Sequence, residues 1–231
     1  MKKKILALML VVAVLAIAAM GTLAYFTDKD SNSNVVTLGN VDIVLDEAAV
    51  TYDPETYTWT AGDERVSANT YGNVYPGAVM PKDPTVHNEG SVDAYVRVKV
   101  TVTDYANWAF LMGGKLNVTA HPEYLNLLVG DLGTGWTITD VTTSGQDAIY
   151  TIQYGEILAA GESTTPVFQN VTIPTNFAKR SAGDSQAYID KLMGSDRTFN
   201  IDVVAEAIQA PGFTSIDDAF AAFTTTKPYG N

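Results

Sequence analysis

The stretch that decides the fold spans residues 92–103 and reads VDAYVRVKVTVT. Valine or alanine occupies every second position, and Asp, Tyr, Arg, Lys or Thr stands between them. Strict alternation over this length, with many β-branched residues, predicts an antiparallel strand with one buried face. Residues 198–208 repeat the pattern, and their apolar side carries Phe199, Ile201, Val203, Ala205 and Ala207.

Shorter β-branched segments follow one another between turn sequences rich in Gly, Pro, Asn and Asp. We expect strands at residues 41–45, 56–60, 85–87, 136–141, 148–154 and 165–173. Helical patterns are few and short, at residues 105–112, 122–129, 184–193 and 215–223, the last behind a capping box that starts at Ser215. This composition of elements predicts a mainly β fold, a jelly-roll-like β-sandwich or Greek key with a few short helices.

The first 24 residues have the layout of a secretory signal peptide. Three lysines precede an uncharged apolar run, and small residues stand at the −3 and −1 positions of a cleavage site between Ala24 and Tyr25. An uncleaved anchor is the alternative, because the apolar run nearly reaches the roughly 20 residues that span a bilayer. We therefore expect a signal-peptide helix at residues 1–24, a mature N-terminal extension at 25–40 and a single sandwich domain at 41–231.

The charge and cysteine content of the chain limit its expected partners and location. The expected mature chain has 11 basic and 26 acidic residues, a net charge of −15, because cleavage removes three of the 14 basic residues. Nucleic acids and anionic lipid surfaces attract basic clusters, so neither is an expected partner. The chain has no cysteine, and it is long enough to form a core without disulfides. An exported chain of this kind fits the surface of a Gram-positive bacterium.

The motifs of common catalytic sites are missing from the sequence. It has no cysteine nucleophile, no Gly-x-Ser-x-Gly elbow and no phosphate-binding loop, and neither His87 nor His121 belongs to a His-Glu-x-x-His motif. Residues 28–34, DKDSNSN, alternate oxygen ligands as a calcium loop does, but Ser33 and Gly39 replace the Gly and Glu that such a loop needs. We expect no enzyme activity, no cofactor and no metal site, and we interpret the histidines as surface or strand-edge residues.

Three stretches resemble the TasA/camelysin family, the secreted biofilm matrix and surface fibre proteins of Firmicutes whose precursors are processed by the signal peptidase SipW. They are GTLAYFTD at residues 21–28 with the strand-like segment 34–45, the block VYPGAVMPKDPTVHNEGSVDAYVRV at 74–98, and AEAIQAPGF at 205–213. Residues 104–197 carry no such likeness. The resemblance implies a jelly-roll sandwich, export to the cell surface or matrix, and a SipW-type signal peptidase as a processing partner.

For TasA-like members the resemblance also implies fibres in which the N-terminal strand of one subunit fills a groove in the next. In this chain the polymerising segment would contain Tyr25, Phe26, Val35, Val36 and Leu38. The expected partners are further copies of the chain, arranged head to tail, and other matrix components, without lasting membrane insertion. In the simpler alternative, residues 35–45 form the first strand of their own subunit.

Two other functions stay open at this point. The same sandwich suits a monomeric surface adhesin or binding module. Camelysin carries a protease label, so a camelysin-like metalloprotease is the second alternative, although no metal-ligand motif in this sequence supports it.

Overall fold

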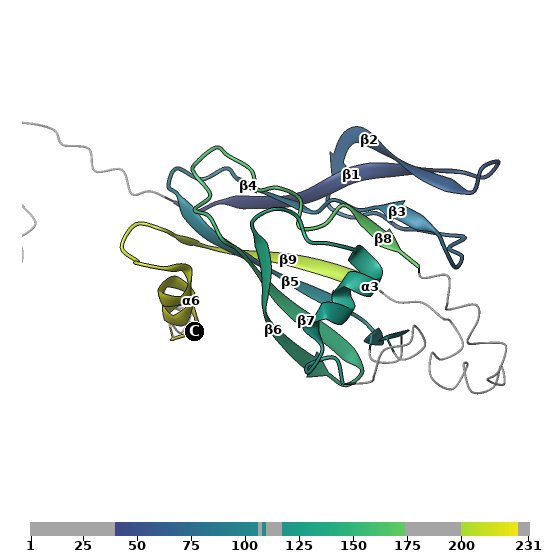
Figure 1. Cartoon of the computed structure of the whole chain (residues 1–231). Helices are drawn as coiled ribbons and strands as arrows, with labels where there is room; N and C mark the ends of the chain where they lie inside the picture. The colour runs from purple at the N-terminus through teal and green to yellow at the C-terminus, as the bar shows by residue number, and fades with distance from the viewer. Residues whose placement is uncertain (1–39, 106–107, 110–116, 174–199, 226–231) are drawn as a thin grey trace, which may run out of the picture. The chain divides into compact units, whose positions relative to one another are not determined.

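A computed structural model describes residues 40–105, 108–109, 117–173 and 200–225, all of which belong to the compact unit Gly39–Asn231. This part is mainly β, with a few short helices, as the sequence predicts (Figure 1). The expected signal helix and the helix expected at residues 184–193 lie outside the described residues.

The two alternating stretches pair with each other in the largest sheet. Its strand order is β6-β7-β5-β9, and every pairing is antiparallel. The strands are β6 Trp136–Ser144, β7 Asp147–Tyr154, β5 Ala94–Val102 and β9 Ile201–Gln209. Val98 of β5 lies opposite Ile152 on one side and Ala205 on the other. Strand β5 therefore pairs on both sides, and alternate residues along its whole length are buried.

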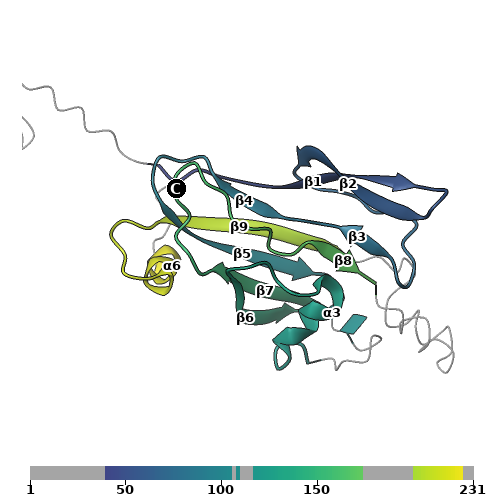
Figure 2. The same cartoon turned by 45° about the horizontal axis from the view of Figure 1, so that its top comes forward.

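Two smaller sheets accompany the large one (Figures 1 and 2). The first has the order β2-β1-β4 and contains β1 Ile43–Asp53, β2 Thr58–Val66 and β4 Thr85–Asn88. The second pairs β3 Val79–Pro81 with β8 Asn170–Thr172. Strand β1 pairs with β4 through its first four residues and with β2 from Glu47 onward. It therefore links β2 and β4 into one sheet.

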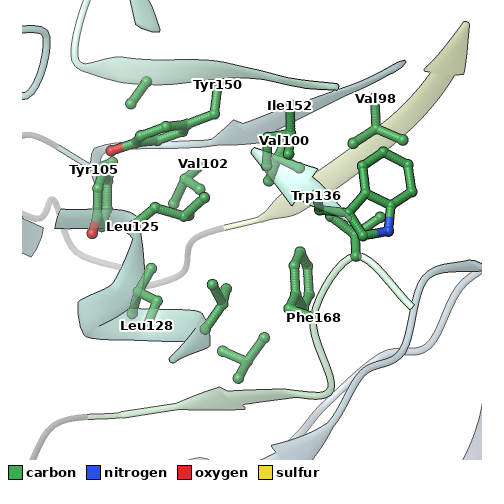
Figure 3. Packing of buried hydrophobic residues seen from close by; sticks show 14 of the residues in the cluster. Val98, Val100, Val102, Tyr105, Leu125, Leu128, Trp136, Tyr150, Ile152 and Phe168 are labelled. Atoms are coloured by element: carbon green, nitrogen blue, oxygen red, sulfur yellow. The ribbon is translucent and has the colours of Figure 1, made fainter. Parts of the chain in front are cut away.

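All three sheets contribute to one hydrophobic core. The even-numbered positions of β5 from Val96 to Val102 are fully buried. Figure 3 shows Val100, Ile152 and Trp136 with Phe168, which comes from the segment before β8. Burying one such aliphatic side chain contributes roughly 1.5–3 kcal/mol, so the alternating positions of β5 contribute substantially to stability.

The short helices pack against the strands: Leu125, Leu128 and Val129 belong to the core, and Phe220 lies against Arg97 of the large sheet. The 3-10 helix η1 Pro122–Leu125 continues into α3 Asn126–Val129, which confirms the helix expected there. Helix α6 Ile216–Thr225 confirms the last predicted helix, and its capping Ser215 Oγ accepts a hydrogen bond of 3.1 Å from the Asp218 N–H. Of the helix expected at residues 105–112, Tyr105, Trp108 and Ala109 are helical and the others lie outside the described residues.

The strand predicted at residues 165–173 is wrong over its first half. Only Asn170–Thr172 pairs, because Pro166 has no N–H to donate to a strand neighbour. The segment instead crosses the core as a loop, in which the Val167 N–H donates to Pro84 O at 2.8 Å and Val167 O accepts from Gly133 N at 2.9 Å. Strands β1, β2 and β6 run past their predicted ends, and β3 was not predicted.

Candidate functional site

The residues predicted to act in processing and assembly all precede the described part of the chain. They are Ala24, Tyr25, Phe26, Val35, Val36 and Leu38. What the structure does describe is the point where this N-terminal segment joins the domain, at residues 40–42. The joint is therefore the first part of the candidate site.

Residues 40–42 are held by the turn that follows β4. The Gly90 N–H donates to Asp42 O and the Ser91 N–H to Asn40 O, both at 3.0 Å. In return, the Asn40 N–H donates to Ser91 Oγ at 3.1 Å. We call residues 40–42 and 88–91 together the anchor, because they bind the end of the N-terminal segment to the domain before β1 begins at Ile43.

Asn88 and Gly90, the Asn-x-Gly sequence within residues 74–98, stabilise the anchor. The Asn88 amide is 1% exposed; its Nδ2 donates to Val92 O and to Leu158 O, and its Oδ1 accepts from the Gly90 N–H at 3.0 Å. A Cβ at Gly90 would lie 2.5 Å from Asn40 O and 2.8 Å from Asp42 N. Only glycine lets the turn approach the incoming chain this closely.

Arg97, from the same block, makes its contacts on the face of the large sheet that points away from the core. Arg97 lies opposite Glu206 on β9, and its Nε donates to Glu206 Oε2 at 2.6 Å. Lys99 Nζ donates to the second oxygen of the same carboxylate at 2.7 Å. The Arg97 guanidinium also stands 4.0 Å from the centre of the Phe220 ring on α6. Arg97 therefore joins β5, β9 and α6.

Within the described residues, each sheet ends in two strands that pair on one side only, and the long ones among these six are β2, β6 and β9. A one-sided strand has a row of backbone N–H and C=O groups available to an incoming strand. Strand β2 carries exposed Asp63 and Glu64, and its pairing with β1 is interrupted by a register shift between Ala48 and Val50. Charges and bulges of this kind discourage strand addition.

The outer edge of β9 is less protected. Its sequence IDVVAEAIQ is largely apolar, and Val204 in its middle is 56% exposed. Of its two acidic residues, Asp202 is exposed near the start of the strand and Glu206 is bound by Arg97 and Lys99. Its pairing with β5 runs without interruption from Ala94 to Val102. Strand β6, at the other edge of the large sheet, has an exposed Asp140 and a register shift between Ile138 and Asp140. Of the three long edges, β9 is thus the better acceptor for an added strand.

A polar row on the β1–β4 sheet has residues of a kind that catalyse acyl transfer. His87 Nδ1 lies 2.6 Å from Ser163 Oγ, and His87 Nε2 lies 2.8 Å from Asp46 Oδ1. The same Asp46 oxygen accepts from Arg65 Nε at 2.8 Å, and Arg65 also binds Asp83 at 2.6 Å. Burial raises the pKa of Asp46, but the hydrogen bonds from His87 and Arg65 outweigh it and lower that pKa.

A serine nucleophile needs a carboxylate that serves the imidazole and donors that stabilise the developing oxyanion. Here Arg65 shares the carboxylate, and the neighbouring Thr164 N–H and Asn88 N–H are both used, by Val86 O and Glu162 O. We interpret the row as a cross-strand ladder that holds residues 161–164 along β4. Sequence reasoning missed it because its members are 41 and 76 positions apart.

His121 makes a local interaction of similar kind. Its Nδ1 lies 3.0 Å from Glu123 Oε1, and its ring stacks on Tyr124 with 4.8 Å between centroids. Within the described ranges, no group of three or more His, Cys, Asp or Glu side chains could hold a metal ion. No helix in that same part of the chain is long and apolar enough to cross a bilayer.

Comparison with known proteins adds no relative. No family model, curated protein or solved structure matches the chain.

Proposed function

We propose that the chain is an exported structural protein that assembles head to tail into fibres on the cell surface or in the extracellular matrix of a Gram-positive bacterium. In this proposal the domain is a jelly-roll-like sandwich without enzymatic activity. A SipW-type signal peptidase cleaves between Ala24 and Tyr25, and the freed segment of one copy adds to the next copy as a strand.

The observation that carries the proposal is the one-sided edge of β9 in the described part of the chain. A nine-residue edge with an apolar middle and Val204 exposed is a surface that an extended segment can cover, through backbone hydrogen bonds and apolar contacts. Such edges are otherwise prone to uncontrolled pairing, so a dedicated occupant is the simplest reason to leave one.

The N-terminal segment has the length and chemistry of that occupant. Residues 25–38 would span about 46 Å when extended, against about 30 Å for the nine residues of β9, at about 3.3 Å per residue. Val35, Val36 and Leu38 supply apolar side chains. Because the anchor holds residues 40–42 to their own domain, the segment before them is presented from one defined point. A donor in one copy and an acceptor in the next form a contact that does not close, which gives a filament.

The experiment is electron microscopy of the exported, processed chain at increasing concentration. We expect filaments from the natural sequence and none after deletion of residues 25–38. A second variant keeps the length but replaces Val35, Val36 and Leu38 by Ser, and it should also fail to polymerise. A control that replaces Asp28 and Asp30 by Ser should still form filaments. Filaments of unchanged abundance after the deletion would exclude the donor-strand mechanism.

A further inference from the structure

A second exposed apolar surface lies away from the assembly elements. The described residues include eight large hydrophobic residues that are exposed, and the two aromatic ones among them are Tyr57 and Tyr75. Tyr57 lies in the turn between β1 and β2 and is 59% exposed, whereas Tyr75 precedes β3 and is 41% exposed. Val74 and Val79, which are also exposed, flank Tyr75. We call Tyr57 and Tyr75 the tyrosine platform.

The buried Trp59 supports the Tyr75 ring of the platform. The Tyr75 ring stacks on Trp59, with 6.3 Å between centroids and 28° between planes. Trp59 is buried and packs in turn against Tyr52 at 4.9 Å. The Tyr75 hydroxyl donates to Tyr57 O at 3.1 Å, so the two segments of the platform are joined directly. The Tyr75 ring, fixed in this way, loses little conformational entropy when a ligand binds.

The surroundings of the platform are negative. Asp53 and Glu55 belong to the same turn as Tyr57, and residues 50–60 and 71–79 contain neither Lys nor Arg. Hydrogen bonds from the Glu55 N–H and the Thr56 hydroxyl lower the pKa of Asp53, so this carboxylate is charged at neutral pH. The chain as a whole has a net charge of −12. The field at the platform therefore favours a cationic ligand and opposes an anionic one.

We propose that the tyrosine platform binds a glycan with free amino groups, such as a polymer of glucosamine. The C–H face of a pyranose ring stacks on an exposed tyrosine. The ammonium group of the sugar is attracted to the carboxylates of the turn and to the faces of the aromatic rings. This binding is independent of polymerisation, since the platform uses neither β9 nor the anchor.

The test is calorimetric titration of the full chain with a glucosamine hexamer at low ionic strength. Two oligomers serve as ligand controls: the N-acetylglucosamine hexamer has the same rings without the charge, and hexalysine has the charge without the rings. We expect the glucosamine hexamer to bind more tightly than either control. Added salt should weaken it, because the charged groups are exposed.

Variants then assign the binding to the platform. Tyr57→Ala and Tyr75→Ala should each raise the dissociation constant about fivefold, the effect of losing one exposed cation–aromatic contact. Glu55→Gln should raise it about twofold. Tyr57→Phe keeps the ring and should bind normally, and so should Ile157→Ala, which removes an exposed apolar residue elsewhere. Thermal unfolding of each variant verifies that the domain is folded.

Three outcomes would overturn the proposal. The first is equal binding of the glucosamine hexamer by the natural chain and by both folded alanine variants. The second is tighter binding of the N-acetylated hexamer, which would show that charge is irrelevant. The third is equal binding of hexalysine, which would show that the sugar ring is irrelevant. None of these outcomes depends on filament formation, so the platform and the fibre proposal can fail separately.

Discussion

Strands β2 and β9 are both nine residues long and both pair on one side only within the described residues, yet their edges differ in chemistry. Strand β2 has six consecutive exposed positions that include Asp63 and Glu64, and its ladder to β1 has a register shift. Strand β9 has an unbroken ladder, an apolar middle and a carboxylate neutralised by two cations. The difference indicates that one edge is protected from pairing and the other is available for it.

The largest effect expected from this comparison is on assembly. Val204→Lys places a charge in the middle of the β9 edge, where an added strand would have to desolvate it, and we expect filaments to disappear. The matched change Thr60→Lys puts the same charge at an exposed position of β2 and should leave filaments unchanged. Electron microscopy and sedimentation of both variants measure the contrast. If Thr60→Lys alone prevented assembly, β2 would be the acceptor edge.

The next effect is on the anchor, and glycine substitutions measure it. Gly90→Ala forces a Cβ to within 2.5 Å of Asn40 O, so the backbone must move, and we expect a loss of about 2–4 kcal/mol in the free energy of unfolding. Gly62→Ala on β2 meets its nearest atom, Ala49 O, at an ordinary 3.5 Å and should change stability by less than about 1 kcal/mol. Urea unfolding of the two variants gives both values. Equal losses would mean that the anchor is not as tight as the structure has it.

Two arginines give a smaller contrast between the same regions. Arg97 beside β9 is largely buried, binds Glu206 and covers the Phe220 ring, so Arg97→Ala should cost about 2–3 kcal/mol. Arg65 on β2 binds Asp46 and Asp83 with a third of its side chain exposed, and Arg65→Ala should cost about 1 kcal/mol or less. Chemical denaturation measures both. A larger loss of stability from Arg65→Ala would contradict the view that the contacts of Arg97 beside β9 are the stronger ones.

The smallest effect is the pH dependence from Glu206. Burial raises the pKa of Glu206, but hydrogen bonds from Lys99 and Arg97 outweigh it, and its pKa falls below the usual 4.5. A carboxyl with a lowered folded-state pKa contributes stability above its unfolded-state pKa, and that stability disappears as the pH falls through its folded-state pKa. The natural chain should therefore lose stability below about pH 4.5. The Glu206→Gln variant should lose less stability over the same range, because its amide side chain does not bind a proton. Thermal unfolding between pH 3 and 7 tests this, and parallel curves would contradict it.

Local patterns predicted the elements well where burial alternates strictly. The apolar positions of β5, β7 and β9 face the core as the sequence indicates, and η1, α3 and α6 begin at Pro122, Asn126 and Ile216, within the expected helices. Prediction failed at residues 165–169, where an apolar, β-branched segment is buried as a loop around Pro166. Its hydrogen bonds go to Pro84 and Gly133, which no local pattern reveals.

For the candidate site, too, some features were visible in the sequence, but their contacts were not. The Asn-x-Gly and Tyr-Val-Arg-Val stretches were visible in the sequence as features of a family-like block, but their purpose was not. Asn40 meets Ser91 across 51 positions, and Arg97 meets Glu206 across 109. The exposed edge of β9 was invisible as well, because alternation shows that a strand has one buried face but not how many neighbours it has.

What the sequence by itself determined is the class of the protein: a mainly β chain whose strands bury one face each. That information is local, because side chains alternate across a strand regardless of what lies beside it. The tertiary structure alone decided which strands pair, which edge is left for a partner, and how Gly90 and Asn88 hold the start of β1. Those features depend on backbone hydrogen bonds between distant segments. Any residue can accept such a bond and any residue except proline can donate one, so they leave little trace in the order of side chains.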